Sequence, residues 1–247
     1  MSPALDLLAI AAHPDDAELS CGGLLALAGD RGQRAGILDL TRGEAATNGT
    51  PAQRAAEAAA AAAVLGLAVR ENAGLPDGGL RGADAAQADA VVERLRRLRP
   101  ALLLAPWWEA RHPDHTAASA LAERAVFLAG LRSHRPDLGA PFRPRTVAFY
   151  PERRDARPAF VVDTSAVFPR KIEALRCHAS QLGAGGEATL LNGPLGLAAF
   201  EIRDRYWGAT IGATHGEPYV LREPVPMADP VAHFAAHPGL PVLWPAP

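Results

Sequence analysis

The chain has 247 residues, a length that one α/β domain can occupy, and we expect a single domain over 1–247. Hydrophobic residues make up 49% of the sequence and charged residues 21%, a composition that argues against wholesale disorder. The 25 Lys and Arg nearly balance the 27 Asp and Glu, which leaves a formal net charge of -2. A nucleic-acid-binding surface is therefore not expected, since such surfaces carry a basic excess.

The sequence shows no signal for a membrane or an oxidising compartment. No run of about 18 apolar residues occurs, so we expect no membrane-spanning helix. The opening segment MSPALDLLAIAAHPDD has no basic region before its apolar run, and we expect no signal peptide. The two cysteines, Cys21 and Cys177, are too few for a disulfide framework and are typical of reduced thiols. These features predict a cytoplasmic protein.

Strand and helix signals alternate through the first half of the chain. We expect strands at 5–12, 32–40, 68–71 and 101–105, and helices at 16–30, 51–65, 84–99 and 116–129. Thr50, Pro51 and Gln53 form a capping box with proline at the first helical position, which marks the start of the second helix. The alternation predicts an α/β fold with a Rossmann-like, mostly parallel sheet and helices on both faces.

The second half is less regular. After a Pro- and Arg-rich connection at 134–145, we expect strands at 146–150 and 159–162, a helix at 165–181, a Gly-rich segment at 182–196, a helix at 198–210 and a Pro-rich tail. The Gly-rich segment is expected to be a mobile loop near the site. No linker separates two domains, so we expect a core over about 1–165 and C-terminal helices with a tail over about 166–247.

Two similar clusters of polar residues stand at matching places in the predicted fold. The segments 13–16 (HPDD) and 112–115 (HPDH) each follow a predicted buried strand and precede a helix. In an open α/β sheet, the carboxyl ends of the strands form the edge where ligands bind. We therefore expect the two clusters to meet at one edge, although about 100 residues separate them in sequence.

The residue types in these clusters suit a divalent metal. Histidine nitrogen and aspartate oxygen are ordinary zinc ligands, and a catalytic zinc keeps three protein ligands and a water. His13, Asp16 and His115 give that number of ligands. Asp15 then stays unligated beside the ion, placed to accept a proton from the bound water. Ferrous iron accepts the same ligands, so the residue types leave both Zn²⁺ and Fe²⁺ possible.

The remaining members of the second cluster have candidate catalytic roles. His112 is placed to stabilise charge on the substrate, and Asp114 to hold that imidazole in its protonated orientation. A structural interpretation is also open, because Asp15 or Asp16 can simply cap the first helix. Two similar clusters after two predicted strands favour the metal site over that interpretation.

Several segments together resemble the PIG-L/LmbE family of zinc-dependent de-N-acetylases. They are AHPDDAELSCGG, which ends at Gly23, TRGEAATNGT (41–50), the helix with Arg54 and Glu57, ENAGLPDG (71–78) and RHPDH (111–115). The TRGE segment, the LPDG turn and the tail RDRYWGATIGATHGEPY (203–219) are similar to the bacillithiol-biosynthesis branch of that family. The resemblance covers nearly the whole chain.

The resemblance implies a role for each matching position. It implies zinc ligands at His13, Asp16 and His115, a general base at Asp15, an electrophilic histidine at His112, and substrate contacts at Glu44 and Arg54. Arg111, beside the second cluster, is a further candidate for anion recognition. Glu44 as an ordinary loop residue and Arg54 as half of a solvated helix pair are the alternative interpretations.

The resemblance also implies a reaction. That reaction is hydrolysis of the N-acetyl group of an N-acetylglucosamine conjugate, which in the bacillithiol branch is N-acetylglucosaminyl-malate. The partner is then a small amino-sugar conjugate, and we expect a homo-oligomer. Apolar tail residues such as Phe234, Leu243 and Trp244 are candidates for packing on a neighbour, and docking of the tail onto its own domain is the alternative.

Three other functions stay open. The first is a deacetylase of another glucosaminyl conjugate, such as a mycothiol precursor. The second is an Fe(II) oxygenase, which also uses two histidines and one carboxylate. The third is a sugar-binding module without catalysis. Dinucleotide binding is not expected, because no G-x-G-x-x-G follows the first predicted strand.

Overall fold

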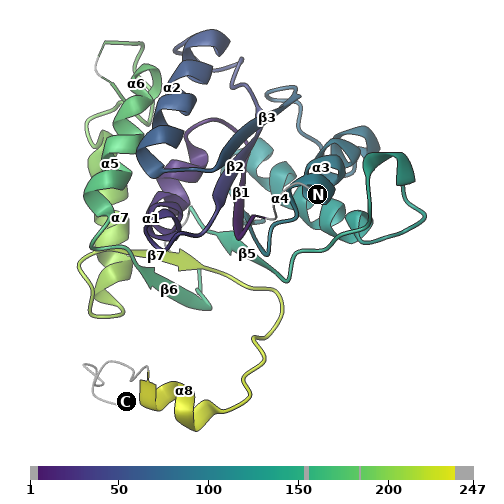
Figure 1. Cartoon of the computed structure of the whole chain (residues 1–247). Coiled ribbons are helices and arrows are strands. Elements are labelled where there is room, and N and C mark those ends of the chain that lie inside the picture. The colour runs from purple at the N-terminus through teal and green to yellow at the C-terminus, as the bar shows by residue number, and fades with distance from the viewer. Residues whose placement is uncertain (1–4, 153–155, 184, 237–247) are drawn as a thin grey trace.

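The computed structural model describes residues 5–152, 156–183 and 185–236, and its centre is a five-stranded sheet in the order β3-β2-β1-β4-β5 (Figure 1). The strands are β1 (Leu7–Ala11), β2 (Ala35–Thr41), β3 (Val69–Leu75), β4 (Leu102–Pro106) and β5 (Thr146–Tyr150), and each pairs in parallel with its neighbours. A second, antiparallel sheet consists of β6 (Phe160–Asp163) and β7 (Gly216–Tyr219). A bridge between Phe149 and Val220 joins it to β5.

Helices cover both faces of the central sheet, as Figure 1 shows. The helices α3 (Ala85–Leu98) and α4 (Pro113–Ala129) cover one face, and α1 (Asp16–Asp30), α2 (Pro51–Leu65) and α5 (Phe168–Cys177) cover the other. Side chains alternate along each strand, so Ile10 and Leu38 belong to one apolar cluster and Ala9 and Ile37 to the other. The predicted α/β fold with a mostly parallel sheet is therefore confirmed.

Two predicted helices have different boundaries in the structure. The helix expected at 116–129 begins at Pro113, because proline suits the first helical position and His112 caps the helix. The second polar cluster is thus the start of a helix and not a loop. The helix expected at 165–181 is divided at His178 into α5 and the short α6 (Ala179–Leu182).

The C-terminal part contains more structure than its prolines indicate. The helix expected at 198–210 is α7 (Gly196–Ala209), and the tail beyond it holds β7 and α8 (Pro230–Ala236). Of the tail residues expected at a subunit contact, Phe234 is exposed, and Leu243 and Trp244 lie outside the described residues. None of the described helices combines the length and apolar composition that crossing a membrane requires.

The helix α1 is kinked where the sequence reads Cys-Gly-Gly. Cys21 has φ -138° and ψ 17°, which are not helical. The backbone amides of Gly23 and Leu24 donate instead to the two carboxylate oxygens of Glu217, at 2.7 and 2.8 Å. A Cβ at Gly23 would lie 2.6 Å from a methyl carbon of Thr164, so the close approach requires glycine there.

Glu217 belongs to a buried ionic cluster between α1, α5, α7 and β7. Lys171 Nζ lies 2.7 Å from Asp204 Oδ2 and 2.6 Å from Glu217 Oε1. Arg203 donates through Nε and Nη2 to Asp204 Oδ1, and through Nη2 to the carbonyl of Leu19. All four charged side chains are buried, so two cations balance two carboxylates away from water.

Substitution of Lys171 by Ala should lower the free energy of unfolding by about 3–5 kcal/mol, since it leaves two buried carboxylates against one guanidinium. Urea unfolding measures the change. The neighbouring Arg170 pairs with Asp30 at the surface, so Arg170→Ala is the matched control and should stay close to the unmodified chain. Equal, small changes in the two variants would show that the cluster does not stabilise the fold.

A candidate metal centre at the carboxyl edge of the sheet

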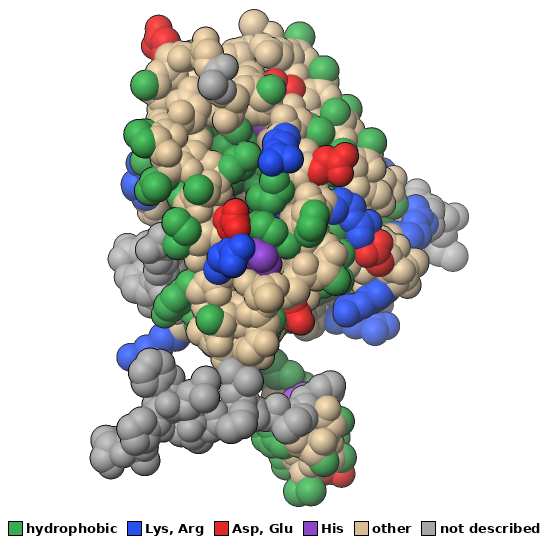
Figure 2. Space-filling view, turned by 90° about the vertical axis from the view of Figure 1, so that its left-hand side faces the viewer, with side chains coloured by type: hydrophobic (Ala, Val, Ile, Leu, Met, Phe, Trp, Pro, Cys, Tyr) green, Lys and Arg blue, Asp and Glu red, His purple; other side chains and the backbone are tan. Residues whose placement is uncertain are grey.

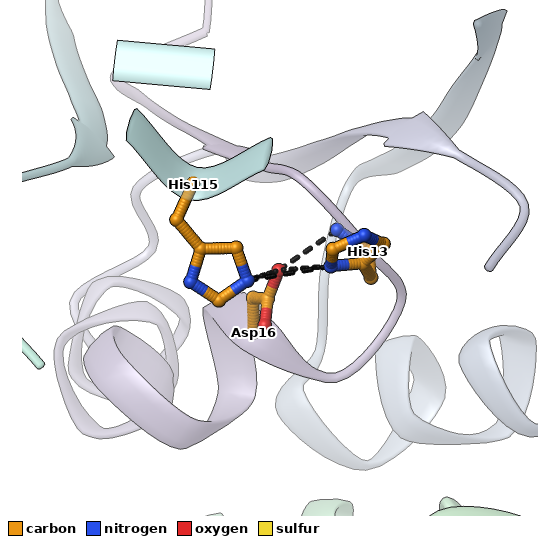
Figure 3. Close-up of side chains that lie close together, drawn as sticks. All are labelled: His13, Asp16 and His115. Atoms are coloured by element: carbon orange, nitrogen blue, oxygen red, sulfur yellow. Dashed lines mark hydrogen bonds and ion pairs between the residues drawn. The ribbon is translucent and has the colours of Figure 1, made fainter. Parts of the chain in front are cut away.

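Three donor side chains meet at the carboxyl edge of the sheet (Figure 3). His13 lies in the turn after β1, Asp16 is the first residue of α1, and His115 lies in the first turn of α4, which follows β4. Because β1 and β4 are neighbours in the parallel sheet, the ends of both strands open at the same place. That adjacency brings together two clusters that are far apart in sequence.

The three donor atoms form a nearly equilateral triangle. Asp16 Oδ2 lies 3.3 Å from His13 Nδ1 and 3.2 Å from His115 Nε2, and the two nitrogens are 3.3 Å apart. Ligands at about 2.0–2.1 Å from a tetrahedral zinc lie about 3.3 Å from one another. The chemistry and the spacing of these donors therefore fit a divalent metal ion, and the group could hold one.

A carboxylate faces the other nitrogen of each imidazole in the triangle. His13 Nε2 lies 2.9 Å from Asp77 Oδ1 and 3.4 Å from Asp114 Oδ2, and His115 Nδ1 contacts a carboxylate oxygen of Glu152. Histidines that bind metals commonly donate their second N–H to a carboxylate, which fixes the ring and raises its basicity. Asp77 and Glu152 were not predicted from the sequence. The sequence features that could have indicated them are the LPDG turn for Asp77 and the position shortly after β5 for Glu152.

These carboxylates make the surroundings of the triangle strongly negative. Burial opposes the charge on both imidazoles, but hydrogen bonds to Asp16 and Asp77 raise the pKa of His13 to about 11. Contacts with Asp16 and Glu152 likewise outweigh burial and raise the pKa of His115 to about 10. Burial alone would raise the pKa of Asp16, yet the two imidazoles hold it well below its usual value. Such surroundings favour a cation.

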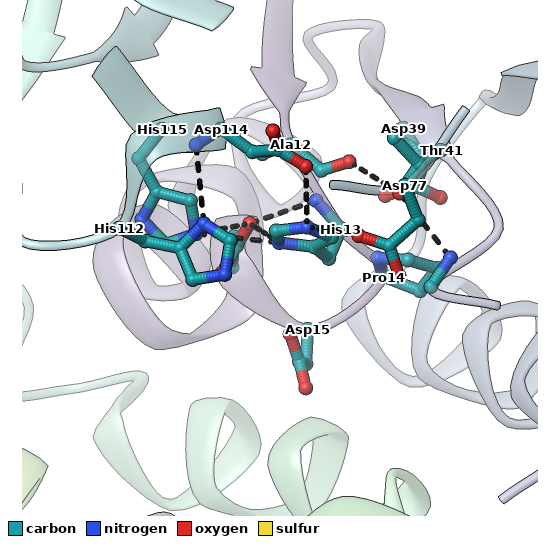
Figure 4. A network of polar contacts seen from close by, with 12 residues as sticks. Ala12, His13, Pro14, Asp15, Asp39, Thr41, Asp77, His112, Asp114 and His115 are labelled. Carbon is teal, nitrogen blue, oxygen red and sulfur yellow. Dashed lines mark hydrogen bonds and ion pairs between the residues drawn. The ribbon is translucent and has the colours of Figure 1, made fainter. Parts of the chain in front are cut away.

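Asp15 lies beside the triangle but outside it. In Figure 4 its carboxylate extends away from the three imidazoles. The residue is buried, lines the cavity, and has φ 113°, a left-handed conformation that is strained for a residue with a Cβ. Burial and the neighbouring Asp16 raise the pKa of Asp15 to about 7, against the opposing charges of Arg54 and His178.

Arg54 stabilises the strained turn at Asp15 through hydrogen bonds. Its Nη2 donates to the carbonyl of Pro14 at 2.6 Å and lies 3.4 Å from Asp15 Oδ2, and its Nη1 donates to the carbonyl of Gly43 at 3.0 Å. Nε is buried and has no partner among the described residues. The sequence predicted a substrate contact for Arg54. In the structure its terminal nitrogens bind the backbone and the carboxylate of the Asp15 turn instead.

The relation between His112 and Asp114 differs from the prediction. His112 Nδ1 accepts a hydrogen bond from the backbone amide of Asp114 at 3.1 Å, so the neutral ring carries its proton on Nε2. Burial and the two neighbouring imidazoles lower the pKa of His112. The carboxylate of Asp114 does not hold the ring. It accepts hydrogen bonds from the backbone amides of Gly78 at 2.7 Å and Leu80 at 3.3 Å, and it therefore stabilises the turn beside the site.

The two remaining predicted substrate contacts, Glu44 and Arg111, lie in different places. The carboxylate of Glu44 accepts from the amides of Arg42 and Asp77, both at 3.1 Å, and the residue does not line the cavity. It therefore positions the turn that carries Asp77, and the predicted contact is not supported by its place. Arg111 is exposed, lines the cavity and has no hydrogen bond among the described residues.

The triangle opens into a cavity of about 580 Å³, a size typical of small-molecule sites. The Gly-rich segment contributes Leu190 and Leu191 to its wall, and α7 contributes Ala199, Phe200 and Arg203. In the face that Figure 2 shows, hydrophobic side chains gather in the middle and are flanked by basic, acidic and histidine side chains. The cavity thus combines a polar end at the triangle with an apolar wall.

Together the fold and the site define a class: a Rossmann-like protein with two histidines and one aspartate converging at the carboxyl edge of its sheet. Residues 8–126 match the model of the PIG-L family, described as GlcNAc-PI de-N-acetylase. The diacetylchitobiose deacetylase of Thermococcus kodakarensis is 30% identical over 186 residues, which cover 71% of this chain and 69% of the relative. The chain therefore belongs to the PIG-L family.

Other relatives have more varied names. The 1D-myo-inositol 2-acetamido-2-deoxy-alpha-D-glucopyranoside deacetylase of Streptomyces avermitilis is 28% identical, with 78% of this chain and 88% of the relative covered. The 4-oxalmesaconate hydratase of Pseudomonas putida is also 28% identical, with coverage of 73% and 75%. The crystal structure of the conserved protein TT1542 from Thermus thermophilus has a TM-score of 0.82 and 45% identity, covering 91% of this chain and 97% of that one.

Substitution of Asp77 by Asn should weaken zinc binding about 10–100-fold, because it removes the charge that orients His13 while keeping the size of the side chain. Competition against a chromophoric chelator measures the affinity. Glu71 lies on β3, six residues before Asp77, and pairs with Arg97 without lining the cavity, so Glu71→Gln is the control. Unchanged affinity in the Asp77 variant would mean that this carboxylate has no part in metal binding.

Proposed function

We propose that this chain is a metal-dependent amidohydrolase that removes acetate from an N-acetylglucosamine conjugate, and that N-acetylglucosaminyl-malate is its substrate. The observation that carries the proposal is the equal-sided triangle of His13, Asp16 and His115 beside the buried Asp15. Zinc is the proposed metal, and ferrous iron is the alternative that the same donors accept. The names of two relatives, both deacetylases of acetylated amino sugars, support the reaction class.

Different side chains around the triangle have different roles in the proposed hydrolysis. A bound divalent metal would supply Lewis-acid activation of a water and of the acetamide carbonyl. Asp15 accepts the proton of the attacking water, a role that suits a carboxyl with a pKa raised to about 7. The Nε2–H of neutral His112 donates to the carbonyl oxygen as negative charge develops there.

Breaking the amide bond also requires a proton for the departing amine. Asp15 is the economical donor, because it has just accepted the proton of the water, and His112 is the other candidate. In both cases Arg54 keeps the Asp15 turn in place through its contacts with Pro14 and Gly43. Arg54 is therefore a positioning residue in this mechanism.

A hydratase is the second candidate, because a hydratase of Pseudomonas putida is among the relatives. The two activities are distinguished by their products, since a hydratase adds water to a double bond and releases neither acetate nor amine. An amide hydrolase releases both in equal amounts.

The chain should release free amine and acetate from N-acetylglucosaminyl-malate faster than from diacetylchitobiose or an N-acetylglucosaminyl-inositol. A chelator should abolish the release, and added Zn²⁺ or Fe²⁺ should restore it, because the donor triangle activates nothing by itself. Amine labelling and an acetate assay follow the reaction. Preference for a neutral conjugate would change the proposed substrate, and no release from any conjugate would overturn the proposed reaction.

Substitution of Asp15 by Asn should lower kcat about 10²–10⁴-fold and leave the metal content unchanged, because the carboxylate acts as a base and not as a ligand. Elemental analysis of the purified variant measures the metal. Asp16→Asn is the matched control at the neighbouring position and should lose metal together with activity. Metal loss in the Asp15 variant would show that the base and the ligand had been exchanged.

A further inference from the structure

The wall that α6 and α7 give to the cavity carries a single charged side chain. Of the lining residues on these two helices, which are Gln181, Ala199, Phe200 and Arg203, only Arg203 is ionised at neutral pH. The other charged lining residues lie on other elements: the carboxylates of Asp15, Asp16, Asp77 and Glu152 are grouped around the imidazoles, and two further arginines, Arg54 and Arg111, also line the cavity. Carboxylates therefore surround the triangle, and Arg203 is the cationic group of the α7 wall.

The guanidinium of Arg203 is anchored by two of its nitrogens and free at the third. Nε and Nη2 donate to Asp204 Oδ1 at 3.0 and 2.8 Å, and Nη2 also donates to the carbonyl of Leu19. Nη1 has no hydrogen bond among the described residues. It is also absent from the fully buried atoms without a partner, so it is not sealed inside the protein. Since the residue lines the cavity, Nη1 is the accessible nitrogen of a fixed guanidinium.

Arg54 also lines the cavity, but its guanidinium is engaged with the turn of Asp15. Its Nη1 and Nη2 already bind the backbone around Asp15, and its Nε is buried. An anion that reached Arg54 would compete with these backbone contacts for the same two nitrogens. At Arg203 it would only have to occupy an unused donor, because the carboxylate of Asp204 already holds the group in place.

Arg203 also lies close to the helix that carries Asp16, one of the three donors. It binds the carbonyl of Leu19, which stands three residues after Asp16 on α1, an axial rise of about 4.5 Å. Phe200 is one turn earlier on α7, with its ring centre 5.5 Å from the Arg203 guanidinium carbon. Triangle, aromatic ring and guanidinium thus line one cavity in an arrangement that a sugar with an attached group could span.

We propose that Arg203 is the residue that binds the carboxylate of an acidic aglycone, through Nη1, while Phe200 contacts the apolar face of the sugar ring. This assignment rests on the proposed function and specifies its substrate class, a conjugate with an anionic group next to the amino sugar. A carboxylate is the natural partner of a guanidinium donor fixed in a partly desolvated wall. The binding role goes to Arg203 in place of Arg54.

The test compares an acidic and a neutral conjugate in the full-length, metal-loaded enzyme. Arg203→Gln should raise KM for N-acetylglucosaminyl-malate at least tenfold and change kcat/KM for methyl N-acetylglucosaminide less than threefold. Arg203→Lys should recover part of the preference for the acidic conjugate, because it keeps the charge. If Arg203→Gln does not fold, Arg203→Lys is the variant on which the preference between the two conjugates is measured.

A purely structural role for Arg203 requires its own control. Lys171 belongs to the same ionic cluster but does not line the cavity, so Lys171→Met disturbs the cluster without touching the proposed contact. Its ratio of kcat/KM values for the two conjugates should equal that of the unmodified enzyme. Equal losses on both conjugates in the Arg203 and Lys171 variants would overturn the proposal.

Calorimetric binding of N-acetylglucosaminyl-malate in the presence of chelator separates this proposal from the proposed function. If the unmodified chain hydrolyses no conjugate, the proposed function fails. Binding that is at least tenfold weaker in Arg203→Gln than in the unmodified chain would still support the assignment of Arg203. Equal binding by the two proteins, or no binding by the unmodified chain, would overturn it.

Discussion

The site depends on the adjacency of β1 and β4 in the parallel sheet. The turn after β1 supplies His13 and Asp16, and the helix after β4 supplies His115, so the donor triangle exists only while these two strands are neighbours. All residues of β1 and all residues of β4 after Leu102 are buried, which stabilises the pairing. The polar side chains follow where the buried strands end, because an unpaired polar group inside the sheet would lose its hydrogen bonds.

Around the triangle, buried charges are held in pairs and networks. Arg54 binds the turn of Asp15, and the cluster of Lys171, Arg203, Asp204 and Glu217 supplies hydrogen bonds at the kink of α1. Each charge would be costly alone in a buried position, and each has partners within hydrogen-bond distance. This arrangement connects the kink of α1, the α7 wall and the turn of Asp15 through hydrogen bonds and ion pairs.

Much of this could be predicted from the sequence, because it depends on local signals. Apolar runs followed by His-Pro-Asp indicated both the order of the elements and the three donors. Asp77 and Glu152 could not be predicted, since carboxylates are frequent in loops and only the fold shows which imidazole nitrogen they face. The division between α5 and α6 at His178 was also missed, because neither proline nor glycine marks it.

The contacts of Arg54 could not be predicted from the sequence for a different reason. Its place on an alanine-rich helix indicates neither burial nor the backbone carbonyls it binds, since Pro14 and Gly43 come from distant segments. The left-handed backbone of Asp15 is equally invisible in the sequence, because it results from the surrounding contacts. The resemblance to a family located these positions, and the fold was needed to assign what each side chain contacts.

The central claim is that His13, Asp16 and His115 bind one divalent metal. Anomalous diffraction from crystals grown with Zn²⁺, recorded on both sides of the zinc edge, tests it most directly. The account predicts one strong peak about 2.0–2.2 Å from His13 Nδ1, Asp16 Oδ2 and His115 Nε2, with the Asp15 carboxylate outside that distance. A zinc peak elsewhere in the molecule, with none at the triangle, would contradict it.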